Sequence, residues 1–385
     1  MIASVQMPGA LGVALLRAGL ASVLISPVAF TLWARYSALR PDRTNAANLW
    51  LNSRRAARAV RLIVVALWWA GWDLQSTDFF ASPSRLLLFW IPPILSVGIS
   101  QSIAYCSVRD ILRLKWRFSD IARLTFWSTM SPTAALIGVA TGAEAIYRGW
   151  WQGTFLLAVS GIVAFAGSVR LRSAEGLQLR PLRLGKLHGR AFQLAKKMSV
   201  KIENVYIVPA GKGHLTNAYG LWRGIALTDN YGEFTNKSQL DFVIGHELMH
   251  VKQRHGRKQL AVTLGLFLFL TLVTFNLPPL AWRLRAIIDV FFLLVPSLAL
   301  YFVSRRFEYA ADRGSVEYTS DPESAIRALE NLYRLTGTPS DCGRIVELFQ
   351  THPALSRRAA AIASIGDIPS DRVNKVLGQS NGIEP

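Results

Sequence analysis

The sequence predicts a mainly α-helical, polytopic membrane protein, in which a polar domain with a small β-sheet follows a multi-span region. Hydrophobic residues make up 51% of the 385 residues and charged residues only 17%, against roughly 25% charged in an average soluble protein. The apolar residues are also grouped into stretches long enough to cross a bilayer, and arginines and lysines gather between alternate stretches.

Five apolar stretches precede residue 170, and each is predicted to cross the membrane: 10–34, 60–80, 86–106, 126–147 and 150–169. The segments after the first, third and fifth stretches are rich in arginine, whereas the segment after the second is not. By the positive-inside rule, the arginine-rich segments face the cytoplasm. This alternation accounts for the net charge of +19 without nucleic acid, for which the sequence contains no binding motif.

The chain is therefore predicted to have three parts. They are an N-terminal membrane region at 1–169, a polar domain at 170–365 that is interrupted by a two-helix membrane hairpin at 260–303, and a flexible tail at 366–385. Because the hairpin crosses the membrane twice, at 260–281 and 286–303, the chain returns to the cytoplasmic side.

Within the polar domain, residues 187–198 have the apolar spacing of an amphipathic helix. Two short runs, 205–208 and 224–229, have the composition of strands. A helix over about 238–255 comes next, because its apolar residues recur at helical spacing before a basic end. Ser238 and Asp241, at the start of this helix, resemble a capping box.

This helix contains the run His246-Glu247-Leu248-Met249-His250, which has the pattern H-E-x-x-H. His246 and His250 are four residues apart and share one helix face, so their imidazoles can bind one Zn²⁺ ion. Glu247 can reach a water on that metal and act as its general base, taking the proton as the metal-activated water attacks a carbonyl.

A catalytic zinc requires a third protein ligand and an open position. Glu308 and Asp312 also share one helix face, directly after the membrane hairpin. Glu308 can ligate the metal, and Asp312 can accept the N–H of a ligand histidine. His255 is five residues beyond His250 and would point about 140° round a continuous helix, so we interpret it as a charge at the helix end and not as a ligand.

The H-E-L-M-H run, two membrane spans and then S-R-R-F-E-Y-A-A-D at 304–312 resemble the membrane-embedded zinc metalloproteases of the HtpX-like and CAAX-prenyl-protease-like group. The resemblance covers about 180–365 and implies a gluzincin-type domain with one Zn²⁺ per chain. The first 170 residues do not resemble the two-span start of HtpX-like members. Prenyl-protease-like members have seven spans, and that count matches this chain.

Two further segments are similar to this family. Asn217 and Ala218, followed by 224–228, look like its N-A-F/Y turn and edge strand, and His352 to Arg358 look like its H-P-x-x-x-x-R segment. The resemblance implies that Asn217, Ala218 and His352 face the substrate backbone and that Arg358 lies near the site. Asn217 and His352 would also help to stabilise the oxyanion. From the residues alone, Arg357 could replace Arg358, and Arg358 could instead be a structural partner of Asp312.

The sequence thus predicts a multi-pass zinc endopeptidase of a bacterial inner or cell membrane, with its active site on the cytoplasmic side. Its partners would be the lipid bilayer and extended or unfolded polypeptides, plausibly from membrane proteins. One alternative is a specific processing protease for lipidated or signal-type substrates. Another is a non-catalytic membrane sensor that binds zinc structurally, although a fourth protein ligand is not evident. The oligomeric state is not indicated.

Overall fold

The computed structural model describes scattered positions between 94 and 146, with 116–131 continuous. It then describes 150–174, 179–208, 218–229 without 222, 236–276, 282–335, and 341–378 without 342, 343 and 349. The predicted spans at 10–34 and 60–80 lie outside the described residues, as does Asn217. The chain divides into two compact units, one of 1–175 with 268–294 and one of 176–267 with 295–385.

The N-terminal unit contains helix α5 (Phe118–Thr125), the π-helix η2 (Phe126–Met130) and helix α7 (Gln152–Ala174). Ser131 follows η2, and its hydroxyl donates to the carbonyl of Val163 in α7, at 3.2 Å. A Cβ atom on Gly153 would lie 2.4 Å from the carbonyl oxygen of Gly142, so these two backbones approach closely.

Two long helices contribute residues to both units. They are α10 (His255–Asn276) and α11 (Trp282–Thr319). Among the described residues, no helix combines the length and the apolar character that crossing a membrane requires.

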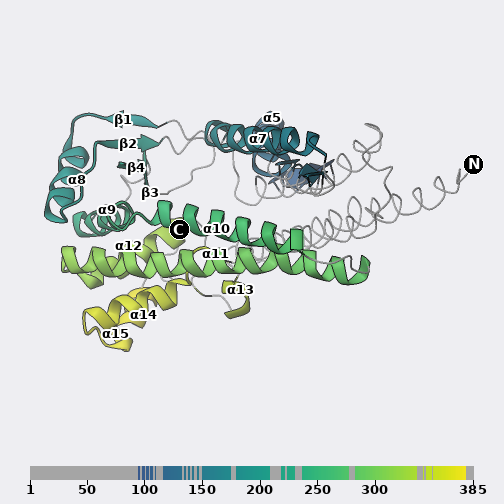
Figure 1. Cartoon of the computed structure of the whole chain (residues 1–385). Coiled ribbons are helices and arrows are strands. Elements are labelled where there is room, and N and C mark those ends of the chain that lie inside the picture. The colour runs from purple at the N-terminus through teal and green to yellow at the C-terminus, as the bar shows by residue number, and fades with distance from the viewer. Residues whose placement is uncertain are drawn as a thin grey trace, which may run out of the picture. The chain divides into compact units, whose positions relative to one another are not determined.

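The second unit contains a four-stranded mixed sheet (Figure 1). Its strands, in the order β1-β2-β4-β3, are β1 (Arg180–Leu182), β2 (Asn204–Val208), β4 (Gly224–Thr228) and β3 (Ala218–Gly220). β2 and β4 are parallel, and the two outer pairs are antiparallel. The predicted strands at 205–208 and 224–229 are confirmed as β2 and β4. The prediction of 224–228 as an edge strand is wrong, because β4 lies between β2 and β3 and is buried along its whole length.

Helix α9 (Lys237–Lys252) lies at the centre of this unit. It contacts β3, β4, α8 (Lys186–Lys197) and α12 (Pro322–Leu335), and α12 in turn packs on α14 (Leu355–Ile365). A Cβ atom on Gly245 would lie 2.5 Å from the hydroxyl of Ser315 in α11. That hydroxyl donates to the carbonyl of Phe242 at 2.8 Å. Glycine at 245 therefore lets α9 and α11 pack closely enough to bring their polar residues together.

Two local predictions are wrong. Asn236, not Ser238, caps α9, because its Oδ1 atom accepts the backbone N–H of Ser238 at 2.9 Å. Asp241 is instead paired with Arg190 of α8, with Nε to Oδ1 at 2.6 Å. The tail, predicted to be flexible from 366, forms helix α15 (Ser370–Gly378), whose valines are buried against the core of the unit. A short helix α13 (Arg344–Leu348) precedes α14.

Candidate metal centre

His246, His250 and Glu308 are brought together in the second unit as a group that could hold a metal ion. α9 carries the two histidines one turn apart, and α11 supplies Glu308 from across the close packing of the two helices. The two Nε2 atoms lie 3.1 Å apart. Glu308 places Oε2 3.6 Å from Nε2 of His246 and Oε1 3.5 Å from Nε2 of His250.

These separations fit a metal. Four ligands at about 2.0–2.1 Å in a tetrahedron lie roughly 3.3 Å from one another, close to the three distances above. Glu308 is 7% exposed, and its buried Oε2 atom accepts no hydrogen bond of normal geometry from the described residues, although His352 Nδ1 and Arg358 Nη1 lie 3.0 and 3.3 Å away. A buried carboxylate oxygen that lacks a well-aligned donor is costly, and coordination to a cation would satisfy it. The donor set, two imidazoles and a carboxylate, suits zinc.

Asp312 lies one turn beyond Glu308 in α11 and orients the first histidine. Its Oδ1 atom is 2.9 Å from Nδ1 of His246. An ionised carboxylate only accepts hydrogen bonds, so Nδ1 of His246 carries the proton and Nε2 keeps its lone pair toward the metal group.

Arg358 binds the same carboxylate in a two-bond arrangement, with Nε and Nη2 each 2.7 Å from an Asp312 oxygen. Its Nη1 atom also lies 3.3 Å from Oε2 of Glu308. Burial by itself would raise the pKa of Asp312, but the guanidinium of Arg358 and the ring of His246 hold it below its ordinary value. Burial also raises the pKa of Glu308, but His352, His250 and Arg358 hold that pKa well below its ordinary value.

The resemblance implies that Arg358 lies near the site, and its guanidinium lies within 3.3 Å of Glu308. The residue is 3% exposed, and its side chain is paired with the two buried carboxylates. Of the alternatives that the sequence left open, partnership with Asp312 is the one observed. Arg357 is ion-paired with Glu347 of α13.

Glu247 follows His246 in α9 and lies against β3 of the sheet. It is buried, and a Cβ atom on Gly220 of β3 would lie 3.3 Å from its Oε2 atom and 3.0 Å from Cβ of His250. A larger residue at 220 would therefore clash with α9. Ala218 begins this strand and pairs with Leu227 of β4.

His352 approaches the group from a loop before α14. Its Nδ1 atom lies 3.0 Å from Oε2 of Glu308, while 61% of its side chain is exposed. Three contacts that the sequence did not predict hold this loop. Arg305 donates to the carbonyls of Glu347 and Gln350 at 2.9 and 2.8 Å. Tyr333 donates to the carbonyl of Pro353 at 2.6 Å.

The prediction that His255 points away from the metal group is wrong. α9 ends at Lys252, Arg254 takes a left-handed conformation with φ of 55°, and α10 begins at His255. This turn brings Nδ1 of His255 to 2.8 Å from Nδ1 of His250. Burial, followed by the nearby charges of His250 and Lys258, lowers the pKa of His255 to about 3. The polar run 252–254 was the available signal for a helix break.

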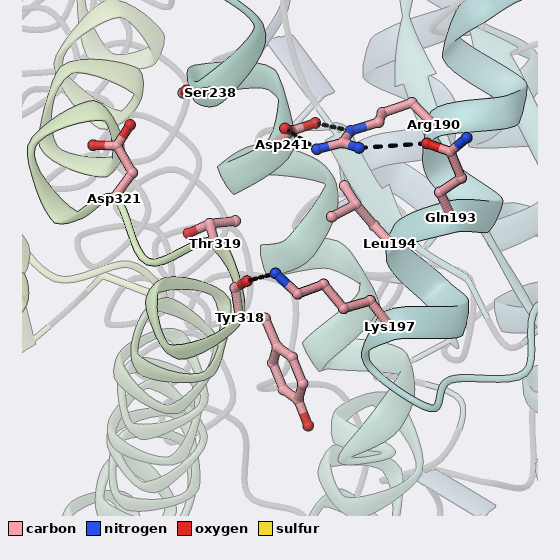
Figure 2. A pocket seen from close by; sticks show the side chains of 9 residues that line it. All are labelled: Arg190, Gln193, Leu194, Lys197, Ser238, Asp241, Tyr318, Thr319 and Asp321. Atoms are coloured by element: carbon pink, nitrogen blue, oxygen red, sulfur yellow. Dashed lines mark hydrogen bonds and ion pairs between the residues drawn. The ribbon is translucent and has the colours of Figure 1, made fainter.

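A separate cavity of about 290 Å³ lies among α8, the start of α9 and the end of α11 (Figure 2). Its lining includes none of the residues of the metal group. Figure 2 shows Arg190 reaching Asp241 and Gln193, and Lys197 reaching the carbonyl of Tyr318. The first of these contacts joins α8 to α9, and the last joins α8 to the end of α11.

Comparison with known proteins agrees with this geometry. The model of peptidase family M48 matches residues 181–365, which contain the whole group. Residues 181–365 are a peptidase family M48 domain. The chain is a metalloprotease, and its M48 domain is similar to that of HtpX proteases.

Relatives of the M48 domain extend the comparison. A protease HtpX homolog from Nostoc sp. is 24% identical over 280 residues, which cover 63% of this chain and 90% of the relative. One from Moorella thermoacetica is 28% identical over 240 residues, 51% of this chain and 77% of the relative. The crystal structure of S. mikatae Ste24p superposes with a TM-score of 0.55 at 15% identity, covering 93% of this chain and 100% of Ste24p. At this identity the likeness concerns the fold alone.

Proposed function

We propose that the chain is an integral membrane zinc endopeptidase that hydrolyses peptide bonds in extended or unfolded polypeptides, with membrane proteins among its substrates. The observation that carries the proposal is the triangle of His246 Nε2, His250 Nε2 and Glu308 Oε atoms, 3.1–3.6 Å apart, with Glu247 beside it. In this proposal these three residues are the ligands of one Zn²⁺, and Asp312 orients His246.

Zn²⁺, when bound, supplies a Lewis acid that polarises the scissile carbonyl and acidifies water. Glu247 takes the proton of the attacking water and delivers it to the leaving amine. It can do so because it is buried beside His250, a proposed metal ligand. His352, which is exposed next to Glu308, and Asn217 donate hydrogen bonds to the oxyanion.

The substrate binds as an added strand along β3. In the sheet of the described residues, β3 is the last strand and pairs with β4. An extended peptide can pair with such an edge through its backbone, with little dependence on sequence. Because Gly220 of β3 abuts Glu247 and His250, a peptide on this edge runs next to the metal group.

The membrane location rests on the sequence and on side-chain exposure. The apolar stretches and their flanking arginines predict spans with the M48 domain on the cytoplasmic side. Helices α7, α10 and α11 expose large apolar side chains, which lipid would cover; they include Phe155, Ile162, Leu264, Phe269, Leu272, Phe291 and Val295.

The test is zinc content together with cleavage of an unfolded protein such as casein, measured on the full chain in detergent. Wild type should contain about one zinc per chain and cleave, whereas Glu308→Ala should lose both the metal and the activity, because two imidazoles alone hold zinc weakly. A Glu308→Ala protein with wild-type zinc content would show that the third ligand is misassigned.

A further inference from the structure

His255 contacts the metal group without belonging to it. It is 4% exposed and lies flat against Phe307, with ring centroids 4.2 Å apart and an interplanar angle of 7°. Its Nδ1 atom is 2.8 Å from Nδ1 of His250, and its Nε2 atom is 2.8 Å from Oε1 of Gln253. The ring is therefore fixed on one face and at both nitrogens.

We propose that His255 is a positioning residue that holds His250 in the tautomer needed to bind a metal, an inference that rests on the proposed function. Gln253 Oε1 accepts the Nε2–H of His255. The Nδ1 atom of His255 then has no proton and accepts the Nδ1–H of His250. His250 thus keeps a free lone pair on Nε2, the atom that faces Glu308 and His246.

The reverse chain of hydrogen bonds is chemically possible but incompatible with metal binding. If the amide NH₂ of Gln253 donated, Nδ1–H of His255 would donate to His250, and His250 would carry its proton on Nε2. A protonated Nε2 cannot ligate a cation. Metal binding thus favours the arrangement in which Nδ1–H of His250 donates to His255, and that arrangement in turn favours metal binding.

The arrangement parallels that of the other histidine ligand. Nδ1 of His246 is fixed by Asp312 at 2.9 Å, and Nδ1 of His250 is fixed by His255 at 2.8 Å. One ligand therefore has a charged acceptor and the other a neutral one. Because α10 begins at His255, the acceptor for His250 comes from the helix after the turn at Arg254.

Two substitutions separate positioning from packing. His255→Phe keeps an aromatic ring against Phe307 and removes the acceptor, whereas His255→Asn loses the ring and keeps an oxygen near the place of Nδ1. If the residue served only to pack, His255→Phe would be the milder change. If it positions His250, His255→Asn would be the milder change. His188→Phe is the matched control, since His188 also lies against a phenylalanine, Phe192, but in α8.

The measurement is zinc affinity of the full-length proteins in detergent, by competition with a chromophoric chelator. We expect His255→Phe to lose about 10–100-fold in affinity, as loss of an outer-sphere partner typically costs, and His255→Asn and His188→Phe to stay close to wild type. The absorption spectrum of the Co²⁺-loaded proteins should change for His255→Phe and not for His188→Phe, since it reports ligand geometry directly.

Wild-type affinity in His255→Phe, or an equal loss in His255→Asn and His255→Phe, would overturn the inference. His246→Ala, measured in the same series, separates this failure from that of the proposed function. If wild type binds no zinc, or if His246→Ala binds it equally well, the metal centre itself is wrong, and the positioning role fails with it.

Discussion

Arg358 supplies the positive charge that balances the buried carboxylates of the metal centre. It is 3% exposed, binds both oxygens of Asp312, and also approaches Glu308. Burying three charged groups together is tolerable only while they are paired, because an unpaired buried charge loses its hydration without compensation. The sequence could identify Arg358 as close to the site, but only the fold shows that it faces the carboxylates.

We therefore predict that Arg358→Leu destabilises the fold by about 3–5 kcal/mol, the usual cost of breaking a buried ion pair. Reversible urea unfolding of the purified protein measures this. Arg313→Leu is the matched control from α11, because Arg313 is 70% exposed and reaches Glu317 only at 4.0 Å; its effect should stay below about 1 kcal/mol. Equal effects of the two substitutions would contradict the assignment of Arg358.

At the scale of elements, the close packing of α9 and α11 brings the ligands together. Gly245 faces Ser315 at this contact, and Gly314 faces Met249. Three residues on from Gly245, Leu248 is fully buried in the core that both helices share. Movement of α11 away from α9 would carry Glu308 away from the two histidines.

We predict that Gly245→Ala destabilises the protein by about 1–3 kcal/mol, the usual cost of overpacking a core, and lowers zinc affinity. In a Ser315→Ala background the same change should cost less, because Ser315→Ala removes the hydroxyl that lies 2.5 Å from the added methyl group. The Cβ atom of residue 315, which remains, lies 3.4 Å from that methyl group. Unfolding of the four proteins of this cycle gives the coupling. Gly189→Ala, in open space on α8, should not destabilise. Additivity of the two changes would contradict the packing account.

A second prediction at this scale concerns pH. Glu323 of α12 accepts hydrogen bonds from Arg327 at 2.8 Å and from Arg372 of α15 at 2.9 Å. These hydrogen bonds, that of Arg327 above all, lower the pKa of Glu323. A carboxyl with a lowered pKa in the folded state stabilises the fold above its unfolded value, near 4.5, and this stabilisation disappears as the pH falls through the folded pKa.

Glu323→Gln should therefore lower the melting temperature at pH 7, by an amount equivalent to less than about 1 kcal/mol because the pair is partly solvated. The difference from wild type should vanish well below pH 4.5. A melting difference that is the same at pH 7 and at low pH would indicate that Glu323 acts by packing and not by charge.

Regular spacing explains which elements the sequence could predict. The apolar repeats predicted α8, α9, β2 and β4 close to their observed bounds. β3 has three residues and no pattern of its own, so the family resemblance points to 224–228 as the edge strand. The polar run 252–254 is compatible with a helix end, but an arginine does not by itself indicate a left-handed turn. The break at Arg254, with φ of 55°, therefore reverses the predicted direction of His255.

The same contrast applies to the candidate site. Spacing of four residues places His246 and His250 on one face of their helix, and it places Glu308 and Asp312 on one face of another. The structure then brings the two pairs together. Contacts between distant segments, such as Arg305 with the carbonyls before His352, depend on the packing of α11 against a loop. Local spacing contains no information about such contacts.

At the scale of the whole molecule, the proposal makes the chain a multi-span protein. Its 51% hydrophobic content and the exposed apolar faces of α7, α10 and α11 predict that it remains in the membrane pellet after an alkaline carbonate wash, since only peripheral proteins are released. A soluble, peripheral control protein in the same preparation should appear in the supernatant. Release of the chain with that control would contradict the membrane location.

In the proposed function, Glu247 is the general base of a zinc endopeptidase. Glu247→Gln is nearly isosteric and leaves the three ligands in place, so zinc content should equal that of wild type. Cleavage of casein by the same samples should fall by at least about 10²–10⁴-fold, the usual contribution of general acid–base catalysis. A Glu247→Gln protein that is fully loaded with zinc and cleaves at the wild-type rate would contradict the account.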